Sequence, residues 1–170
     1  MALTISVFPS SWGWLGLALS DKGLAGVILP QPSEQTAWER IHMEHPGETR
    51  VESDPWPAVR TRLLAYLEGD PSDFSGIPLD LPDRPPFWRK VWETCARIPY
   101  GETRSYAQLA AEAGSPRAFR AVGGAMAANP IPIIVPCHRV VGSNGSLVGF
   151  GGGLPQKKRM LEMEAAAARG

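Results

Sequence analysis

The segment around Cys137 holds the residue types that nucleophilic catalysis requires. Cys137 is followed directly by His138 and Arg139, and it comes after an apolar run over residues 131–135. Cationic neighbours favour the thiolate, which is the reactive form of a cysteine. The apolar run predicts a strand that presents Cys137 near its end. Because neighbouring residues of a strand point to opposite faces, a proton would pass between Cys137 and His138 only through a bend or a water molecule.

Two segments downstream could complete a site around this cysteine. Residues 155–164 predict a helix, in which Glu162 or Glu164 could orient the imidazole of His138 as the third member of a triad. The position of the helix in the sequence does not choose between the two glutamates. Residues 149–153 predict a Gly-rich loop that closes over the same region, where its backbone amides could bind a flat ligand. The loop lacks the patterns of a phosphate loop and of a dinucleotide fingerprint.

Two short helices are predicted before the cysteine. Ser105 opens the first with a capping box, and this helix runs through Ala113. Ser115 caps the second, which runs through Ala128. A helix, a tight turn and a helix in a basic region form the helix-turn-helix pattern. The same pattern is found in helix pairs of proteins that bind no DNA.

The second of these helices is poor in the side chains that read bases. It contains Gly123, Gly124 and several alanines, with Arg120 and the nearby Arg117 as its long polar side chains. Reading the major groove uses several Arg, Asn or Gln side chains. A helix with so little bulk is suited either to the minor groove or to tight packing in a core, and both interpretations remain open here.

The first half of the chain predicts a small antiparallel sheet. Its strands are expected over residues 3–8, 12–19 and 23–30, with a turn over residues 20–23. A helix over residues 56–69 should lie on this sheet. The polar stretch between strand and helix contains two histidines but no cysteine, so we expect no metal site in it.

A change in composition divides the chain. Residues 70–86 contain five prolines and predict an extended connection. The formal net charge is −6 from Met1 to Pro86 and +6 from Phe87 to Gly170. We therefore expect an N-terminal domain over residues 1–80, a connection to about residue 86, and a C-terminal domain over residues 87–170 with affinity for an anion such as a phosphate backbone.

Several classes of protein are excluded by the composition. The 170 residues contain no apolar run of roughly the 18 residues that a membrane span needs. The N-terminus lacks the pattern of a signal peptide, so we expect a cytoplasmic protein. Cys95 and Cys137 are the two cysteines, too few for a disulfide scaffold or a metal site. Cys95 is predicted on the inward face of a helix over residues 87–97, where its thiol should be inert.

Residues 87–164 resemble a known family. The resemblance is carried by Ser105-Tyr106-x-x-Leu109-Ala110, Arg120-Ala121-Val122-Gly123, Asn129-Pro130 and, above all, Pro136-Cys137-His138-Arg139-Val140. These motifs are similar to those of the O6-alkylguanine-DNA alkyltransferases, also called methylated-DNA–protein-cysteine methyltransferases. The resemblance implies an α/β (α+β) fold class, with a small ribonuclease-H-like antiparallel sheet and helix followed by a mainly helical, winged helix-turn-helix-like domain that bears the cysteine.

The resemblance also implies roles for the reacting residues. Cys137 would accept the alkyl group, and His138 would take the thiol proton through a water molecule. Glu164 would hold the histidine, because the spacing from Cys137 to Glu164 matches that of the family while the spacing to Glu162 does not. Asn129 would tie the turn that positions the cysteine.

A second set of residues is implied to bind the base and the DNA: Tyr106, Ser115, Arg120, Ser143, Val140, Phe150 and Gly151. Tyr106 would donate a hydrogen bond near O6 or N3 of guanine and rotate the phosphate. Arg120 would occupy the place of the extruded nucleotide. The backbone of Val140 and of the loop at Gly151 would read the base. Many relatives carry Tyr in place of Phe150 and Ser or Ala in place of Gly151, so a side-chain hydroxyl is missing at both positions.

The chemistry implied is direct reversal of DNA damage. The protein would flip an alkylated guanine out of double-stranded DNA at an unstacking cost of about a few kcal/mol. The alkyl group would move irreversibly from guanine O6, and possibly from thymine O4, to Cys137. One molecule would repair one lesion as a monomer, without cofactor or metal.

Two other functions compete with this one. A Cys-His-Glu hydrolase or acyl transferase would need an oxyanion hole and a direct contact between Cys137 and His138, which their adjacency makes awkward. A helix-turn-helix regulator would bind an operator, and Cys137 would then be structural.

Overall fold

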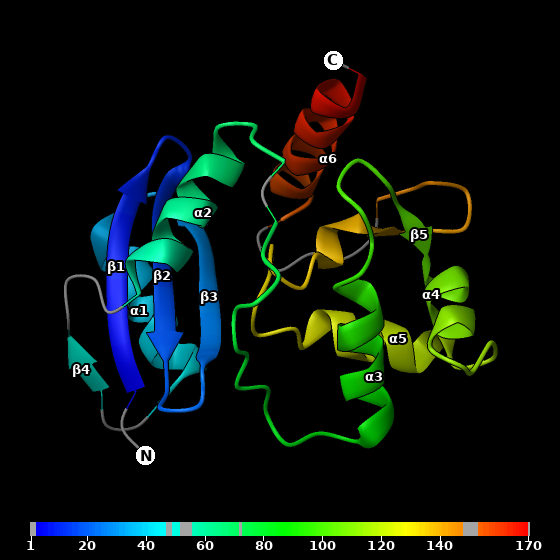
Figure 1. Cartoon of the computed structure of the whole chain (residues 1–170), viewed down its shortest axis with the longest axis horizontal. Helices are drawn as coiled ribbons and strands as arrows, with labels where there is room; N and C mark the ends of the chain where they lie inside the picture. Colours follow the sequence, from blue (N-terminus) through cyan, green and yellow to red (C-terminus); the bar gives the residue numbers. More distant parts are fainter. Residues whose placement is uncertain (1–2, 47–48, 52–55, 72, 148–152, 170) are drawn as a thin grey trace. The chain divides into compact units, whose positions relative to one another are not determined.

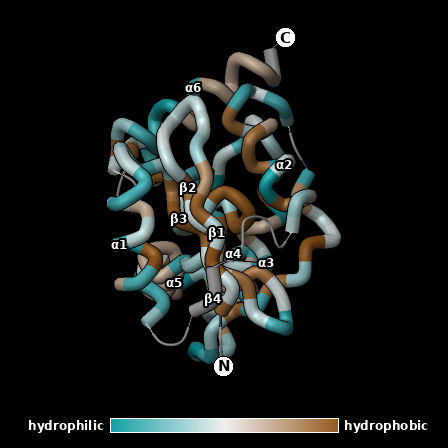
Figure 2. The backbone as a smooth tube through the Cα atoms, turned by 90° about the vertical axis from the view of Figure 1, so that its left-hand side faces the viewer, coloured by the Kyte–Doolittle hydropathy of each residue, from teal (hydrophilic) through white to brown (hydrophobic). Residues whose placement is uncertain are grey.

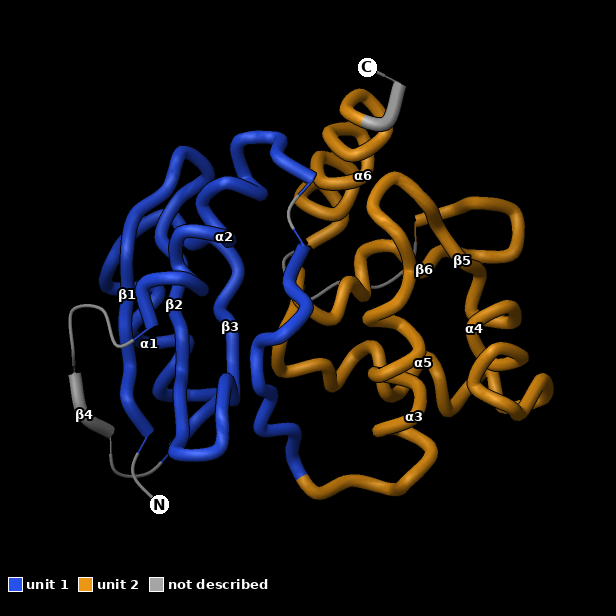
Figure 3. The backbone as a smooth tube through the Cα atoms, viewed as in Figure 1, with its two compact units in different colours: residues 1–82 blue, residues 83–170 orange. Residues whose placement is uncertain are grey.

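The computed structural model describes residues 3–46, 49–51, 56–71, 73–147 and 153–169. The chain divides into two compact units, Met1–Pro82 and Asp83–Gly170, which are coloured separately in Figure 3. Each unit is described by itself. The elements of the first unit are β1 (Leu3–Ser10), β2 (Gly13–Leu19), β3 (Leu24–Gln31), α1 (Glu34–Glu44), β4 (Thr49–Val51) and α2 (Pro57–Leu67).

The first unit is built on a four-stranded sheet in the order β3-β2-β1-β4. β1 pairs with β2, and β2 with β3, in antiparallel orientation. The turn between β2 and β3 is closed by a hydrogen bond of 2.9 Å from the amide of Ser20 to the carbonyl of Gly23. The predicted three-stranded antiparallel sheet is therefore confirmed. β4 adds a short parallel strand beside β1 that the sequence did not predict.

The alternation of side chains along the strands gives the sheet two apolar faces, each with a helix (Figure 1). On one face, Ile41 of α1 packs in a cluster with Ile5, Ala18 and Ile28. On the other face, the guanidinium of Arg60 in α2 lies 5.1 Å from the ring centre of Phe8. The strands are accordingly the most hydrophobic part of the unit in Figure 2.

The helix α1 was not predicted, because its apolar pattern is sparse. Only Ala37 and Ile41 of its eleven residues are buried. Its start is nevertheless marked in the sequence by a capping box, in which Ser33 and Thr36 each accept a hydrogen bond from the other's backbone amide. α2 begins and ends close to the predicted positions, and Val59, Leu63 and Leu67 form its buried face as predicted.

The second unit is mainly helical. Its elements are α3 (Pro86–Cys95), β5 (Arg104–Ser105), α4 (Tyr106–Glu112), α5 (Phe119–Ala127), the 3-10 helix η1 (Cys137–Arg139), β6 (Val140–Val141) and α6 (Leu154–Arg169). The capping box at Ser105 is confirmed: Ser105 and Gln108 bond each other's backbone amides. α3 and α5 are joined by a hydrogen bond of 2.8 Å from the indole of Trp92 to the carbonyl of Ala125. With the strands and helices of the first unit, this confirms the mixed α/β class.

The helix α5 begins three residues later than predicted. Ser115 was expected to cap it, but its amide bonds to the carbonyl of Ala110 and its carbonyl accepts from the amide of Ala118. Ser115 thus belongs to the turn that ends α4, where Gly114 has a φ of 92°. The N-cap residue of α5 is Ala118, which has no side chain that could bond the first amides. The predicted start was wrong because the turn competes for the serine.

No helix among the described residues is long and apolar enough to cross a membrane.

Candidate active site

The segment before Cys137 is a tight turn, and not the predicted strand. The amide of Val135 bonds to the carbonyl of Ile131 at 2.9 Å, and Ile133 has a φ of 74°. Asn129 holds both ends of this turn: its side-chain amide donates to the carbonyl of Val135, and its side-chain oxygen accepts from the amide of Ile131. An apolar run satisfies a strand pattern and a buried turn equally well, so the hydrogen bonds of Asn129 decided the outcome.

Cys137 begins the 3-10 helix that follows the turn. The residue is partly exposed, and burial of its thiol raises the pKa. The side-chain amide of Asn129, the charge of Lys157 and the backbone N–H groups of residues 137 and 138 act in the opposite direction and lower it. The thiolate would therefore be stabilised by several donors that converge on one sulfur.

His138, Arg139 and Glu164 form a buried polar cluster behind the cysteine. The Nε2 atom of His138 lies 2.5 Å from Oε2 of Glu164. Nε of Arg139 donates to Oε1 of Glu164 at 2.8 Å. His138 and Glu164 are at most 1% exposed. Glu162 is exposed and lies 3.8 Å from Lys158, so geometry selects Glu164 as the partner of the histidine.

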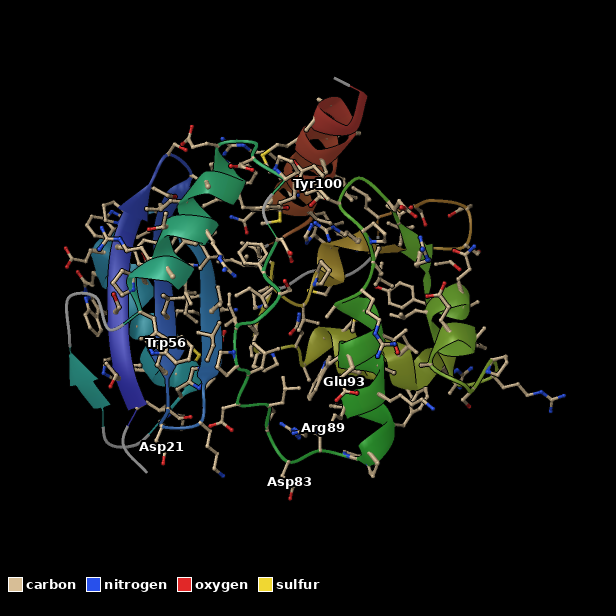
Figure 4. The ribbon with its side chains drawn as sticks, in the orientation of Figure 1. Asp21, Trp56, Asp83, Arg89, Glu93 and Tyr100 are labelled. Carbon is tan, nitrogen blue, oxygen red and sulfur yellow. The ribbon has the colours of Figure 1, made fainter. Side chains whose placement is uncertain are left out.

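The cluster is anchored to the segment after α3. Nη1 of Arg139 donates to the carbonyl of Ile98 at 2.8 Å, and its guanidinium lies 5.5 Å from the ring centre of Tyr100. Tyr100, labelled in Figure 4, lies beside α6. The amide of Gly101 also reaches Oε1 of Glu164, at 3.3 Å. Arg139 thus forms a buried ion pair with Glu164.

The charges within this cluster follow from its contacts. Burial alone would raise the pKa of Glu164, but the hydrogen bonds and charges of His138 and Arg139 outweigh it and lower the pKa to about 2. Burial lowers the pKa of His138, against the opposing effect of Glu164. At neutral pH the cluster holds an ionised carboxylate beside a neutral imidazole.

Lys157 is a site residue that the sequence reading missed. Its side chain is fully buried, and Nζ donates to the carbonyl of Val140 at 2.7 Å. Burial lowers the pKa of Lys157, while the nearby charge of Cys137 raises it. A lysine beside Lys158 and Arg159 in a polar helix looks like part of a solvated face. Only its position on the helix relative to buried Met160 and Glu164 hints that it points inward.

Tyr106 is the first residue of α4 and comes directly after the short parallel pair of β5 and β6. In this pair Ser105 lies opposite Val141. Burial and the charge of Cys137 raise the pKa of the Tyr106 hydroxyl, so it remains a hydrogen-bond donor at neutral pH. The amide of Val140 bonds to the carbonyl of Cys137, and its carbonyl accepts from Lys157.

The remaining predicted residues lie at the periphery or outside the description. Arg120 is exposed in the first turn of α5, and Ser115 is half-buried in the turn before it. Ser143 is exposed in the turn after β6. Phe150 and Gly151 lie outside the described residues.

Cys95 is a buried thiol. Its side chain is fully buried in α3, and burial raises its pKa well above the usual value. The described residues contain no group of three or more His, Cys, Asp or Glu side chains that could hold a metal ion.

Comparisons with known proteins agree on one family. Residues 86–166 match the family described as 6-O-methylguanine DNA methyltransferase, DNA binding domain. The chain is 44% identical to the methylated-DNA–protein-cysteine methyltransferase of Haemophilus influenzae over 166 residues, which covers 96% of this chain and 87% of that protein.

Solved structures give the same result across both units. The O6-methylguanine methyltransferase of Mycobacterium tuberculosis is 38% identical, with a TM-score of 0.79 over 97% of this chain and 94% of that one. The protein of the same organism in complex with DNA has a TM-score of 0.80 at 38% identity, over 96% and 94% of the two chains. The chain therefore belongs to the methylated-DNA–protein-cysteine methyltransferases, enzymes that repair DNA by transferring an alkyl group to a cysteine.

Proposed function

We propose that this protein transfers an alkyl group from O6 of guanine in double-stranded DNA to its own Cys137, once per molecule. The observation that carries the assignment is the buried pair of His138 and Glu164, which lies next to Cys137. Of the two cysteines, both in the described part of the chain, Cys95 is buried and Cys137 is partly exposed. A histidine fixed by a carboxylate next to a thiol is the arrangement that activates a nucleophile.

The ionisation of Glu164 decides which nitrogen of His138 acts as the base. Because the carboxylate is ionised at neutral pH, it can only accept hydrogen bonds. Nε2 of His138 must therefore carry the proton and donate to Glu164. The neutral imidazole then presents the lone pair of Nδ1, which takes the thiol proton through a water molecule. Arg139 keeps the carboxylate ionised and oriented.

Lys157 and Asn129 also assist the deprotonation of Cys137. Their positive charge and amide donor lower the pKa of Cys137 against the effect of burial. Lys157 is held in place by its bond to the carbonyl of Val140. The turn closed by Asn129 fixes where the thiolate emerges.

The transfer itself is a displacement at the alkyl carbon. The thiolate of Cys137 forms the new sulfur–carbon bond, the bond from that carbon to guanine O6 breaks, and its electron pair stays on the guanine. The hydroxyl of Tyr106 donates a hydrogen bond that stabilises this leaving group. The product is a thioether, and the other cysteine, Cys95, is a buried thiol that cannot remove the alkyl group. The reaction therefore stops after one turnover.

DNA is engaged by the surface that includes α5. Arg120 occupies the place of the flipped nucleotide, and Ser115 and Ser143 contact the phosphate backbone. The backbone of Val140 and the loop with Phe150 and Gly151 bind the extruded base. The protein acts as a monomer without cofactor, and O4-alkylthymine is a second substrate of the same pocket.

Mass spectrometry after mixing with a duplex that contains O6-methylguanine tests this proposal. We expect a stoichiometric gain of about 14 Da on the peptide of Cys137, and none with unmodified duplex or with Cys137→Ala. Modification of Cys95 would contradict the assignment. Turnover of an activated ester would instead support a hydrolase. Operator-selective binding that survives Cys137→Ser, without any alkyl transfer by the wild type, would support a regulator.

A further inference from the structure

The helix α5 carries an exposed aromatic ring in its first turn. Phe119 is 51% exposed, and the other large hydrophobic side chains exposed among the described residues are the aliphatic Met43 and Leu154. The ring is followed immediately by the exposed Arg120. At binding surfaces, aromatic rings supply much of the contact energy.

The geometry of the helix places Arg120 on the exposed face of α5 and Phe119 at the edge of that face. Successive residues of an α-helix are about 100° apart. The residues that face the core are Val122, Ala125 and Met126. Arg120, Gly123 and Ala127 lie on the opposite face. Phe119 lies at the boundary between the two faces, about 20° from the line of Met126.

The centre of this opposite face is smooth. A Cβ atom added at Gly123 would meet nothing within 4 Å, and Ala127 is exposed. The exposed face of α5 therefore has small side chains along its length. The large side chains of Arg120 and Phe119 lie in its first turn, with Phe119 at the edge of the face. One of them, Arg120, is charged, and the other, Phe119, is apolar.

The charge of this part of the sequence favours a polyanion as the occupant of the face. Residues 113–161 contain no Asp or Glu. Of their six Lys and Arg residues, Arg139 and Lys157 are buried, whereas the exposed ones are Arg117, Arg120, Lys158 and Arg159. They also lie within the segment that matches the DNA binding domain of the family. Duplex DNA offers both the phosphate charge for the basic residues and stacked bases for an aromatic ring.

We propose that Phe119 is a second DNA-contacting side chain, which packs as an apolar wedge against the bases beside the nucleotide that Arg120 replaces. The inference rests on the proposed function of Cys137 and adds a residue to it. Apolar wedges help to unstack base steps in the minor groove, and an aromatic ring stacks on any base. Phe119 therefore assists extrusion without reading sequence.

Two substrates separate this role from an effect on the active site. We expect Phe119→Ala to lower the rate of alkyl transfer from a subsaturating O6-methylguanine duplex about tenfold, because stacking and burial of the ring are lost. Transfer from free O6-benzylguanine, which needs no extrusion, should stay within twofold of the wild type. Phe119→Trp should restore transfer from duplex. Met43→Ala, which removes a 71% exposed hydrophobic side chain from the first unit, is the control and should change neither rate.

Salt dependence gives an independent readout. Phe119 carries no charge, so Phe119→Ala should weaken duplex binding without changing the slope of log K against log salt concentration. Arg117→Ala should make this slope shallower by about 0.9, the contribution of one phosphate contact.

The inference is wrong if Phe119→Ala transfers from duplex within twofold of the wild type, or if it loses the same factor on both substrates. A wild-type protein that alkylates Cys137 with neither substrate would overturn the proposed function instead. In that event the duplex affinity of Phe119→Ala still tests the contact.

Discussion

The imidazole of His138 and the carboxylate of Glu164 meet at 2.5 Å in a site that excludes solvent from both side chains. They are 26 residues apart in the sequence, and α6 supplies the carboxylate. The same carboxylate also binds the guanidinium of Arg139 through both oxygens. One buried negative charge thus serves a histidine that must act as a base and an arginine that must stay charged.

The first prediction concerns removal of this charge. Glu164→Gln leaves Arg139 buried without a counter-ion, which should lower the free energy of unfolding by about 3 kcal/mol or more. The rate of transfer from free O6-benzylguanine should fall at least about tenfold, because the imidazole loses its orientation. Urea unfolding and single-turnover transfer measure the two effects. Glu162→Gln, at an exposed position on the same helix, should leave both unchanged.

The second prediction concerns the stability of the protein at acidic pH. Glu164 has a folded-state pKa of about 2, below its unfolded value, so its contribution to stability is complete above pH 4.5 and is lost as the pH falls toward 2. The pKa of His138 is also lowered on folding, so protonation of this histidine below pH 6.5 favours the unfolded state as well. Both effects have the same sign. Urea midpoints measured from pH 7 to pH 3 should fall steadily in the wild type.

A matched variant isolates the share of the carboxylate in that pH dependence. Glu164→Gln should have a shallower dependence below pH 4.5 than the wild type, because the titrating group is gone. Equal slopes in the two proteins would show that the pH dependence comes from other groups.

The third prediction concerns Lys157. Lys157→Met removes a positive charge that lowers the pKa of Cys137, so the pH profile of Cys137 alkylation by iodoacetamide should shift to higher pH. The rate at pH 7 should fall about tenfold and recover at higher pH. Lys158→Met, at a 67% exposed side chain next in the sequence, is the control and should not shift the profile. A uniform loss at every pH would point to misplacement of the sulfur and not to its ionisation.

The fourth prediction separates base flipping from ordinary DNA affinity at Arg120. Arg120→Ala should slow transfer from an O6-methylguanine duplex strongly, because nothing then fills the place of the extruded nucleotide. Transfer from free O6-benzylguanine should be nearly unchanged. Arg117→Ala, in the turn before α5, should cost only salt-dependent affinity. Equal losses of Arg120→Ala on both substrates would reject the role.

The fifth prediction concerns the first unit. The ring of His45, at the C-terminal end of α1, lies directly over Gly26 of β3, where an added Cβ would collide with it. Gly26→Ala should therefore lower the free energy of unfolding by about 1–3 kcal/mol. His45→Ala should relieve most of this loss in the double variant, as a double-mutant cycle in urea would measure. Additive effects of the two substitutions would contradict the contact.

Some features of this protein can be predicted from short stretches of its sequence. The strands β1, β2 and β3 are short runs rich in apolar residues, with a turn between β2 and β3. The capping box of α4 lies within four residues, and α2 shows its buried face at helical spacing. The motif from Pro136 to Val140 likewise predicts the family without any knowledge of the fold. Each of these features depends on interactions within one element, so a short stretch of sequence is enough to predict it.

Other features were decided by contacts that the sequence pattern does not reveal, some within a few residues and others between distant segments. The turn over residues 131–135 replaced a predicted strand because Asn129 bonds its ends. Ser115 caps no helix because the turn after α4 uses its backbone. Lys157 and Glu164 point inward on a helix whose sequence looks polar, because Val140, His138 and Arg139 supply partners for them. Burial of a charged group is favourable only where the fold brings its partners together, and sequence distance does not reveal which of two glutamates, or which of two lysines, meets that condition.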